Sequence, residues 1–242
     1  MRLLHYFLHS VSKSNDRIVG GSAVQKHSLP WQVSLVAIDR NRFPWCGGTI
    51  ISDRHVLTAA HCMYIFPDNY TLPLEPLDKN LIGVVVGEHD WTDTSHGEEY
   101  GVNCKHVHPR YDPNTGIYPN RIFDWDVAIL VLNRKIVIGR KQQPACLPPA
   151  RRFTDRYLGG KNLLVSGWGQ LAYDEYGPDR LNSVELPFIP WGECKNLLPE
   201  GWVKRIMICA GNVEDGGVSA CYGDSGGITK IILILEKGKS IT

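Results

Sequence analysis

The sequence lacks a long hydrophobic run and a strong imbalance of charge. No apolar stretch reaches the roughly 18–20 residues that a membrane-spanning helix needs. The formal net charge is only +1 at pH 7, which argues against a nucleic-acid partner and against binding to an anionic membrane. Strong helical periodicity is scarce, and neither βαβ alternation nor a P-loop is present. These absences exclude a nucleotide-binding α/β domain.

The seven cysteines are an odd number, so at least one thiol has no partner within the chain. None forms a CxxC pair, and their spacing suits no zinc ribbon or finger. This many cysteines in 242 residues predicts an oxidising compartment and therefore secretion. A signal peptide is not evident, because Met1 to Ser10 offers only a short apolar stretch broken by His5 and His9.

The 24 glycines and 15 prolines indicate many turns and favour a β-rich fold. Apolar patterns predict a series of strands, while the irregular segment 63–80 is predicted to be a surface insertion. The predicted strands lie at 31–36, 46–52, 55–58, 81–87, 124–132 and 163–169.

A serine in a loop of small residues is the strongest candidate nucleophile. Residues 221–227 read Cys-Tyr-Gly-Asp-Ser-Gly-Gly, which leaves the Ser225 hydroxyl accessible. Such a hydroxyl needs an adjacent base and amide donors for the developing oxyanion. The N–H groups of Gly223 and Ser225 are suited to that second task, because no side chain at 223 blocks the approach. The alternative interpretation is an ordinary turn.

His61 is the best candidate base among the nine histidines. A disulfide between Cys46 and Cys62 would close a loop of 15 intervening residues and fix the backbone beside it. Asp126 leads directly into a buried apolar strand, where a carboxylate must accept hydrogen bonds. A histidine that the Asp126 carboxylate orients would donate such a hydrogen bond. Asp124 is the competing candidate.

Two further patterns indicate binding or modification. Glu88, Asp90 and Glu99 place carboxylates at the ends of one loop, which suits calcium; the alternative is a solvated acidic loop. Asn69-Tyr70-Thr71 matches the acceptor pattern for N-glycosylation.

Nine segments together resemble the chymotrypsin/trypsin family of serine endopeptidases, over residues 17–227. The order His61, Asp126, Ser225 is also that of the family. The segments are RIVGG (17–21), PWQVSL (30–35), CGGTIIS (46–52), VLTAAHC (56–62), DVAILVL (126–132), CLP (146–148), SGWG (166–169), ICAG (208–211) and CYGDSGG (221–227).

The resemblance implies an all-β fold of two antiparallel six-stranded barrels with the active site between them. It divides the chain into a pro-segment or remnant leader (1–17), an N-terminal barrel (18–139), a linker (140–160) and a C-terminal barrel (161–242). We expect the second barrel to be incomplete, because family members continue well beyond the position of Thr242.

The resemblance also assigns roles. His61, Asp126 and Ser225 would form the catalytic triad, with the amides of Gly223 and Ser225 as the oxyanion hole. The expected disulfides are Cys46–Cys62 and Cys194–Cys209. No cofactor is required. The expected partners are polypeptide substrates, an activating protease and serpin-type or other protein inhibitors.

Activation and specificity follow from the same resemblance. Cleavage after Arg17 would free the α-amine of Ile18 to pair with Asp224, so the chain is expected to be a zymogen. Ser219 matches the floor of the substrate pocket, where trypsin-like members carry an aspartate. An uncharged floor predicts a preference for apolar or aromatic residues.

A different class of function remains open at this point. A non-catalytic, protease-like module that binds partners or inhibitors would explain the missing C-terminal portion. The complete set of triad residues argues for the enzyme instead.

Overall fold

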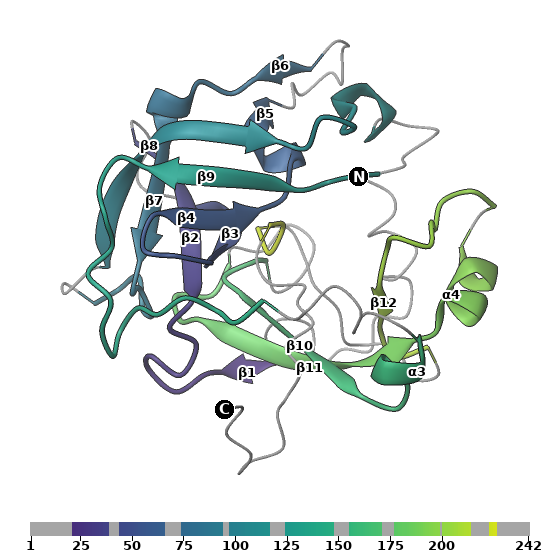
Figure 1. The fold of residues 1–242 in the computed structure, drawn as a ribbon. Helices are drawn as coiled ribbons and strands as arrows, with labels where there is room; N and C mark the ends of the chain where they lie inside the picture. The colour runs from purple at the N-terminus through teal and green to yellow at the C-terminus, as the bar shows by residue number, and fades with distance from the viewer. Residues whose placement is uncertain are drawn as a thin grey trace.

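The structure is a computed structural model. It describes residues 21–38, 44–65, 74–93, 97–116, 124–147, 155–170, 177–198, 200–213 and 223–226. Antiparallel strands dominate these residues, and the helices are few and short (Figure 1). The all-β class predicted from the sequence is therefore confirmed.

Six antiparallel strands close into a barrel in the order β2-β3-β4-β9-β8-β7. The register shifts between Leu35 and Val36 and between Val102 and Cys104, and such irregularities bend strands as closure requires. The six strands are β2 (Gln32–Ala37), β3 (Pro44–Ile50), β4 (His55–Thr58), β7 (Ile82–Val86), β8 (Glu98–Val107) and β9 (Ala128–Leu132).

Alternating burial explains how the barrel is filled. In β9 the side chains of Ala128, Leu130 and Leu132 are buried, whereas Ile129 and Val131 are partly exposed. One face of the strand thus packs into the barrel and the other faces outward. The apolar runs predicted as strands form β2, β3, β4, β7 and β9 within a few residues of the predicted bounds.

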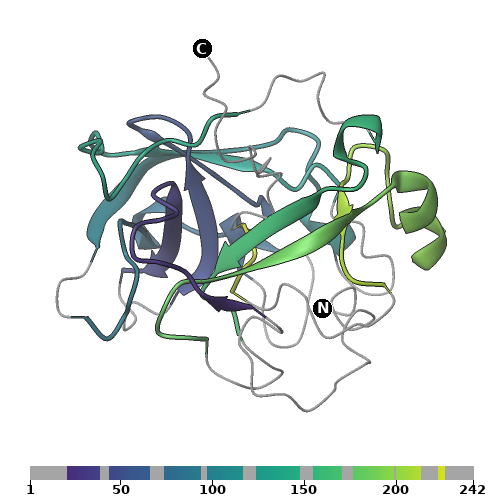
Figure 2. The same cartoon turned by 90° about the horizontal axis from the view of Figure 1, so that it is seen from below.

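The second half of the chain contributes a four-stranded sheet. It contains β10 (Asn162–Gly167), β11 (Asn182–Ile189) and β12 (Cys209–Ala210), together with β1 (Ser22–Ala23) from the start of the chain. Ser22 pairs with Ser183 of β11. Figures 1 and 2 show β1 lying along β11, on the opposite side of that strand from β10. Residues 22–23 therefore lie with the second half, although the sequence placed them in the N-terminal barrel.

Within the described residues, two α-helices, one pair of short strands and three 3-10 helices accompany the barrel and the sheet. The helices α3 (Asp155–Leu158) and α4 (Trp191–Leu197) lie at the end of this sheet that is remote from the barrel (Figure 1). Strands β5 (Tyr64–Ile65) and β6 (Glu75–Pro76) pair with each other. The short 3-10 helices are η1 (His61–Met63), η2 (Lys79–Leu81) and η3 (Pro113–Gly116). The described residues of the predicted insertion 63–80 thus include the paired strands β5 and β6 and the start of η2.

The two halves meet through buried polar groups as well as apolar ones. The Ser166 hydroxyl on β10 donates to Gln32 Oε1 on β2 over 2.9 Å, and both residues are almost completely buried. A buried polar pair of this kind fixes one relative position of the two elements, because separation would leave both groups unsatisfied. Among the described helices, none has both the length and the apolarity of a membrane span.

The cysteines that the structure describes form two disulfides, Cys46–Cys62 and Cys194–Cys209. These are the two pairings that the family resemblance implied. The first joins β3 to η1, directly beside His61. Cys104 and Cys146 are free thiols.

We expect the double substitution C46A/C62A to lower the free energy of unfolding by about 3 kcal/mol, because it opens a 15-residue loop. Urea denaturation measures this. C146A is the matched control, since it removes an exposed free thiol and should change the stability by less than about 0.5 kcal/mol. Equal stability of the double variant and the control would contradict a structural role for the bond.

Candidate active site

His61 and Asp126 form the best-defined polar pair of the site. His61 begins η1 three residues after the end of β4, and Asp126 lies two residues before β9, the strand that pairs with β4. The His61 amide donates to Asp126 Oδ1 over 2.8 Å, and His61 Nδ1 lies 2.7 Å from Asp126 Oδ2. An ionised carboxylate only accepts hydrogen bonds, so in the neutral form of the imidazole the proton is on Nδ1 and the lone pair is on Nε2.

Asp124, the competing candidate, does not contact His61. Its Oδ2 instead lies 3.2 Å from Lys204 Nζ in the second half of the chain. The structure therefore selects Asp126 as the partner of the histidine. Asp124 and Asp126 are only two residues apart, so the backbone turn between them decides which carboxylate faces His61.

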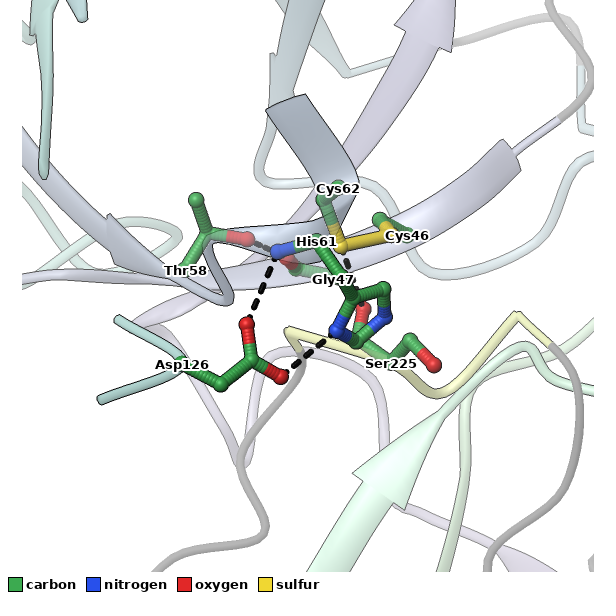
Figure 3. The surroundings of a disulfide bond; sticks show 7 residues. All are labelled: Cys46, Gly47, Thr58, His61, Cys62, Asp126 and Ser225. Carbon is green, nitrogen blue, oxygen red and sulfur yellow. Dashed lines mark hydrogen bonds and ion pairs between the residues drawn. A yellow bond between two sulfur atoms is a disulfide. The ribbon is translucent and has the colours of Figure 1, made fainter. Parts of the chain in front are cut away.

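Ser225 is held against the barrel by its own backbone. Its carbonyl oxygen accepts a hydrogen bond of 2.8 Å from the amide of Gly47 on β3. The same oxygen lies 3.5 Å from Cys62 Sγ, so the disulfide forms part of the surface on which the loop sits. Figure 3 shows the imidazole of His61 between Asp126 and Ser225, with Nε2 on the side away from Asp126.

The loop around Ser225 fits its surroundings only because glycine follows it. Gly226 has φ +73°, and a Cβ there would overlap Thr58 Oγ1 and lie 2.9 Å from both Ala59 N and Gly47 O. Thr58 is fixed in turn, because its hydroxyl donates to Gly47 O over 2.8 Å. The loop thus approaches β3 and β4 as closely as backbone contact allows.

Asp224 points the other way, into the second half. It is 3% exposed, and its Oδ1 accepts a hydrogen bond of 2.8 Å from the amide of Gly169. A Cβ at Gly167 or Gly169 would overlap this carboxylate. The two glycines that flank Trp168 therefore make the space in which the Asp224 side chain lies.

The side chains of His61 and Asp126 are partly shielded from solvent. The side chains of His61 and Asp126 are 22% and 18% exposed, so their attraction is screened less than that of a surface pair. Burial, and then the charge of Asp126, raise the pKa of Tyr111. Tyr111 is consequently a neutral neighbour of Asp126 throughout the physiological range of pH.

The acidic loop does not gather its carboxylates around a common point. Glu88 Oε1 accepts from the amides of His89 and Asp90, and its Oε2 accepts from Gly97. Asp90 is bound by Thr92 and Arg180, whose hydrogen bonds lower the pKa of Asp90 to about 2.

Glu99 is the second residue of β8, next to the loop that precedes this strand, and it pairs with Val85. Among the described residues, one group of three potential metal ligands comes together, Cys46, His61 and Cys62, and its two sulfurs are joined in the disulfide. The prediction of calcium at Glu88, Asp90 and Glu99 therefore gains no support from these residues, because protein donors already engage Glu88 and Asp90.

Several predicted site residues lie outside the described part of the chain. These are Arg17, Ile18, Asn69 and Ser219. Two residues with a clear place in the site received no role from the sequence: Gly47, whose amide holds Ser225, and Gly169, whose amide holds Asp224. Both glycines lie in segments that carry the family resemblance, and this resemblance is the one sequence feature that could have pointed to their roles.

We expect G226A to destabilise the protein by about 1–3 kcal/mol more than G160A. Gly160 has the same φ of +73° but nothing within 4 Å of an added Cβ, so G160A reports the backbone cost alone, about 1–2 kcal/mol. Thermal unfolding gives the difference. Only G226A should also slow the reaction of Ser225 with a fluorophosphonate. Equal effects of the two substitutions would show that the contact with Thr58 does not constrain the loop.

Comparison with known proteins agrees with this geometry. The Trypsin family model matches residues 18–228. Mannan-binding lectin serine protease 1 of Homo sapiens is 34% identical over 230 residues, which are 92% of this chain and 30% of that protein. Cationic trypsin-3 of Rattus norvegicus is 34% identical over 215 residues, 88% of this chain and 74% of that protein. Ovochymase-2 of Mus musculus is 34% identical over 217 residues, 88% of this chain and 32% of that protein.

The chain spans about a third of the length of mannan-binding lectin serine protease 1 and of ovochymase-2, but three quarters of serine protease 1 of Rattus norvegicus, to which it is 32% identical. The family model extends over the barrel and the loop that carries Ser225. The chain belongs to the trypsin family of serine proteases.

Proposed function

We propose that this chain is a serine endopeptidase that hydrolyses peptide bonds through an acyl-enzyme. The observation that carries the proposal is the pair of hydrogen bonds from His61 to Asp126, at 2.8 and 2.7 Å. It leaves Nε2 of the imidazole as a base on the side where Ser225 lies (Figure 3). A weak nucleophile with an oriented base beside it is the arrangement that acyl transfer needs.

The reaction proceeds in two halves. Nε2 of His61 takes the proton of Ser225 as its Oγ attacks the peptide carbonyl, and the carbonyl oxygen becomes the oxyanion. The imidazolium then gives this proton to the departing amine, which leaves an ester on Ser225. A water molecule, deprotonated by His61, attacks the ester, and the acid product and free Ser225 result. Asp126 stabilises the imidazolium in both halves and stays ionised.

The oxyanion needs donors that are already in position. We assign this role to the amides of Gly223 and Ser225, two residues apart in the loop that the Gly47 bond attaches to the barrel. Loss of one such donor costs about 10²–10³ in kcat in comparable sites. The hydrogen bond that attaches the loop to the barrel therefore contributes to catalysis, because it fixes the position of these amides.

The proposed specificity is for apolar or aromatic side chains before the cleaved bond. It depends on Ser219, the uncharged residue six positions before Ser225. A carboxylate at this position would pair with Lys or Arg, whereas serine offers only a hydroxyl. Cationic trypsin-3 is among the relatives, so the choice between basic and apolar substrates is a direct test.

We also propose that the chain is a zymogen, activated by cleavage after Arg17. The Asp224 carboxylate is buried, and a cation that pairs with a buried carboxylate offsets part of the cost of its burial. The α-amine of Ile18 would supply that cation. Pairing would hold Asp224, and with it the neighbouring amides of the oxyanion hole, in the active position.

The remaining parts of the proposal concern surroundings and partners. The two disulfides suit an extracellular protein, with Asn69 as an N-glycosylation acceptor. Its partners would be polypeptide substrates, an activating protease and protein inhibitors. Calcium is not part of the proposed function, because amides and Arg180 already occupy the predicted ligands Glu88 and Asp90.

The function is tested with peptide anilides on the chain cleaved after Arg17. We expect Phe or Leu substrates to be hydrolysed faster than Arg substrates, S225A to abolish turnover, and D126N to lower kcat by about 10⁴-fold. D124N is the matched control, since Asp124 contacts Lys204 and not His61, and it should retain at least a hundredfold more kcat than D126N. A folded, cleaved chain without turnover would favour the non-catalytic binding module. Faster cleavage after Arg would overturn the proposed specificity alone.

The activation switch makes a separate prediction. Both I18G and D224N should fold yet lose about 10²–10³ in kcat/KM, as expected when oxyanion donors are lost. An α-amine titrates near about 8, so the wild type should lose activity as rising pH deprotonates Ile18 and removes its charge. Uncleaved R17Q should stay inactive at every pH. Full turnover by I18G or D224N, measured from initial rates, would refute the switch.

A further inference from the structure

The backbone that leads into Asp126 has an unusual conformation. Trp125 has φ +58°, and His27 is the other non-glycine residue with positive φ in the part of the chain that the structure describes. Large L-residues avoid this left-handed region because Cβ crowds the carbonyl oxygen. The strained residue is thus the one immediately before the carboxylate that binds His61.

Specific contacts keep Trp125 in this conformation. Its ring stacks on that of His108, with centroids 4.7 Å apart and planes at 11°, and the guanidinium of Arg110 lies 4.9 Å from its centroid. The partners are themselves ordered, because the Arg110 amide donates to His108 Nδ1 over 3.2 Å and the Tyr111 amide donates to His108 O over 2.9 Å. The turn that follows β8 therefore provides a fixed surface for the indole.

Backbone hydrogen bonds connect this turn to the strand that carries Asp126. The Val127 amide donates to Trp125 O over 2.7 Å, and the His108 amide donates to Val127 O over 3.0 Å. Asp126 lies between the two bonded residues. Its side-chain direction is set by the dihedral angles at positions 125 and 126, so a change at Trp125 would turn the carboxylate away from His61.

The two bonds to His61 make the site sensitive to such a change. Asp126 must present Oδ1 to the His61 amide and Oδ2 to Nδ1 at the same time, at 2.8 and 2.7 Å. A misplacement of about 1 Å in a reacting constellation costs about 10²-fold in rate. The conformation of Trp125 therefore bears directly on the alignment of the pair.

We propose that Trp125 is a positioning residue for Asp126: its stack on His108 and Arg110 holds the left-handed backbone that aims the carboxylate at His61. The kinetic part of this inference rests on the proposed function, whereas the structural part concerns the hydrogen bond between Asp126 and His61. That bond has its own signature, a low-field proton resonance from Nδ1–H, because a charge-assisted hydrogen bond strongly deshields the proton.

The experiment compares W125A, W125G and W125F by proton NMR and by kcat and KM. W125A removes the stack but keeps the Cβ, so its resonance should be lost or move upfield and kcat should fall about 10²-fold with KM little changed. W125G also loses the stack but adopts positive φ without cost, so it should recover about tenfold of that loss. W125F keeps an aromatic ring and should retain the signal. H27A and H27G are the matched controls for positive φ away from the site.

A packing role alone would give the opposite order for alanine and glycine, because glycine leaves the larger void and the more flexible backbone. A W125A variant with an unchanged resonance, kcat and KM, or a W125G variant worse than W125A in both readouts, would overturn the inference. Should W125A fail to fold, H108A and R110A, which each remove one stacking partner, must shift the resonance for the inference to stand. Loss of the resonance in W125A while even the wild type lacks turnover would support the inference and refute the proposed function. A wild type without the resonance would refute the inference.

Discussion

The hydrogen bond from the Gly47 amide to the carbonyl of Ser225 joins two parts of the molecule that the chain itself keeps far apart. The loop residue Ser225 is 163 positions away from Cys62, and no local structure connects them. Three contacts hold the loop against the barrel: the backbone hydrogen bond of 2.8 Å, the close approach of Gly226 to Thr58, and the packing of the loop on the disulfide. Every chemical step assigned to Ser225 requires the loop to be held in this position.

The parts of the fold that the sequence predicts are those with a local pattern. Strands β2, β4 and β9 follow from apolar runs and alternation, and His61, Asp126 and Ser225 stand in segments that the family resemblance identifies. Asp126, which lies two residues before β9, is the carboxylate that reaches both the amide and the ring of His61.

The parts that the sequence does not predict depend on partners distant along the chain. The acidic residues Asp90 and Glu98 pair with Arg180 and Arg134, which are distant along the chain, so the sequence around the acidic loop carries no signal for these ion pairs. The left-handed backbone at Trp125 likewise has no local signal, since tryptophan does not favour that region and its stacking partner His108 belongs to another turn. Nor does any pattern in Ser22 or Ala23 indicate pairing with β11.

The pairing of β1 with β11 limits how far a newly formed N-terminus can travel. A cut after Arg17 would leave residues 18–21 between the new α-amine and the anchored Ser22. Four residues span at most about 14 Å when fully extended. The amine would therefore search a small volume around the second sheet rather than the bulk solvent, at an effective concentration far above that of a free peptide. Insertion of the terminus would thus be an intramolecular step. Much of its entropic cost would already be offset, because the pairing of β1 with β11 restricts the chain when the protein folds.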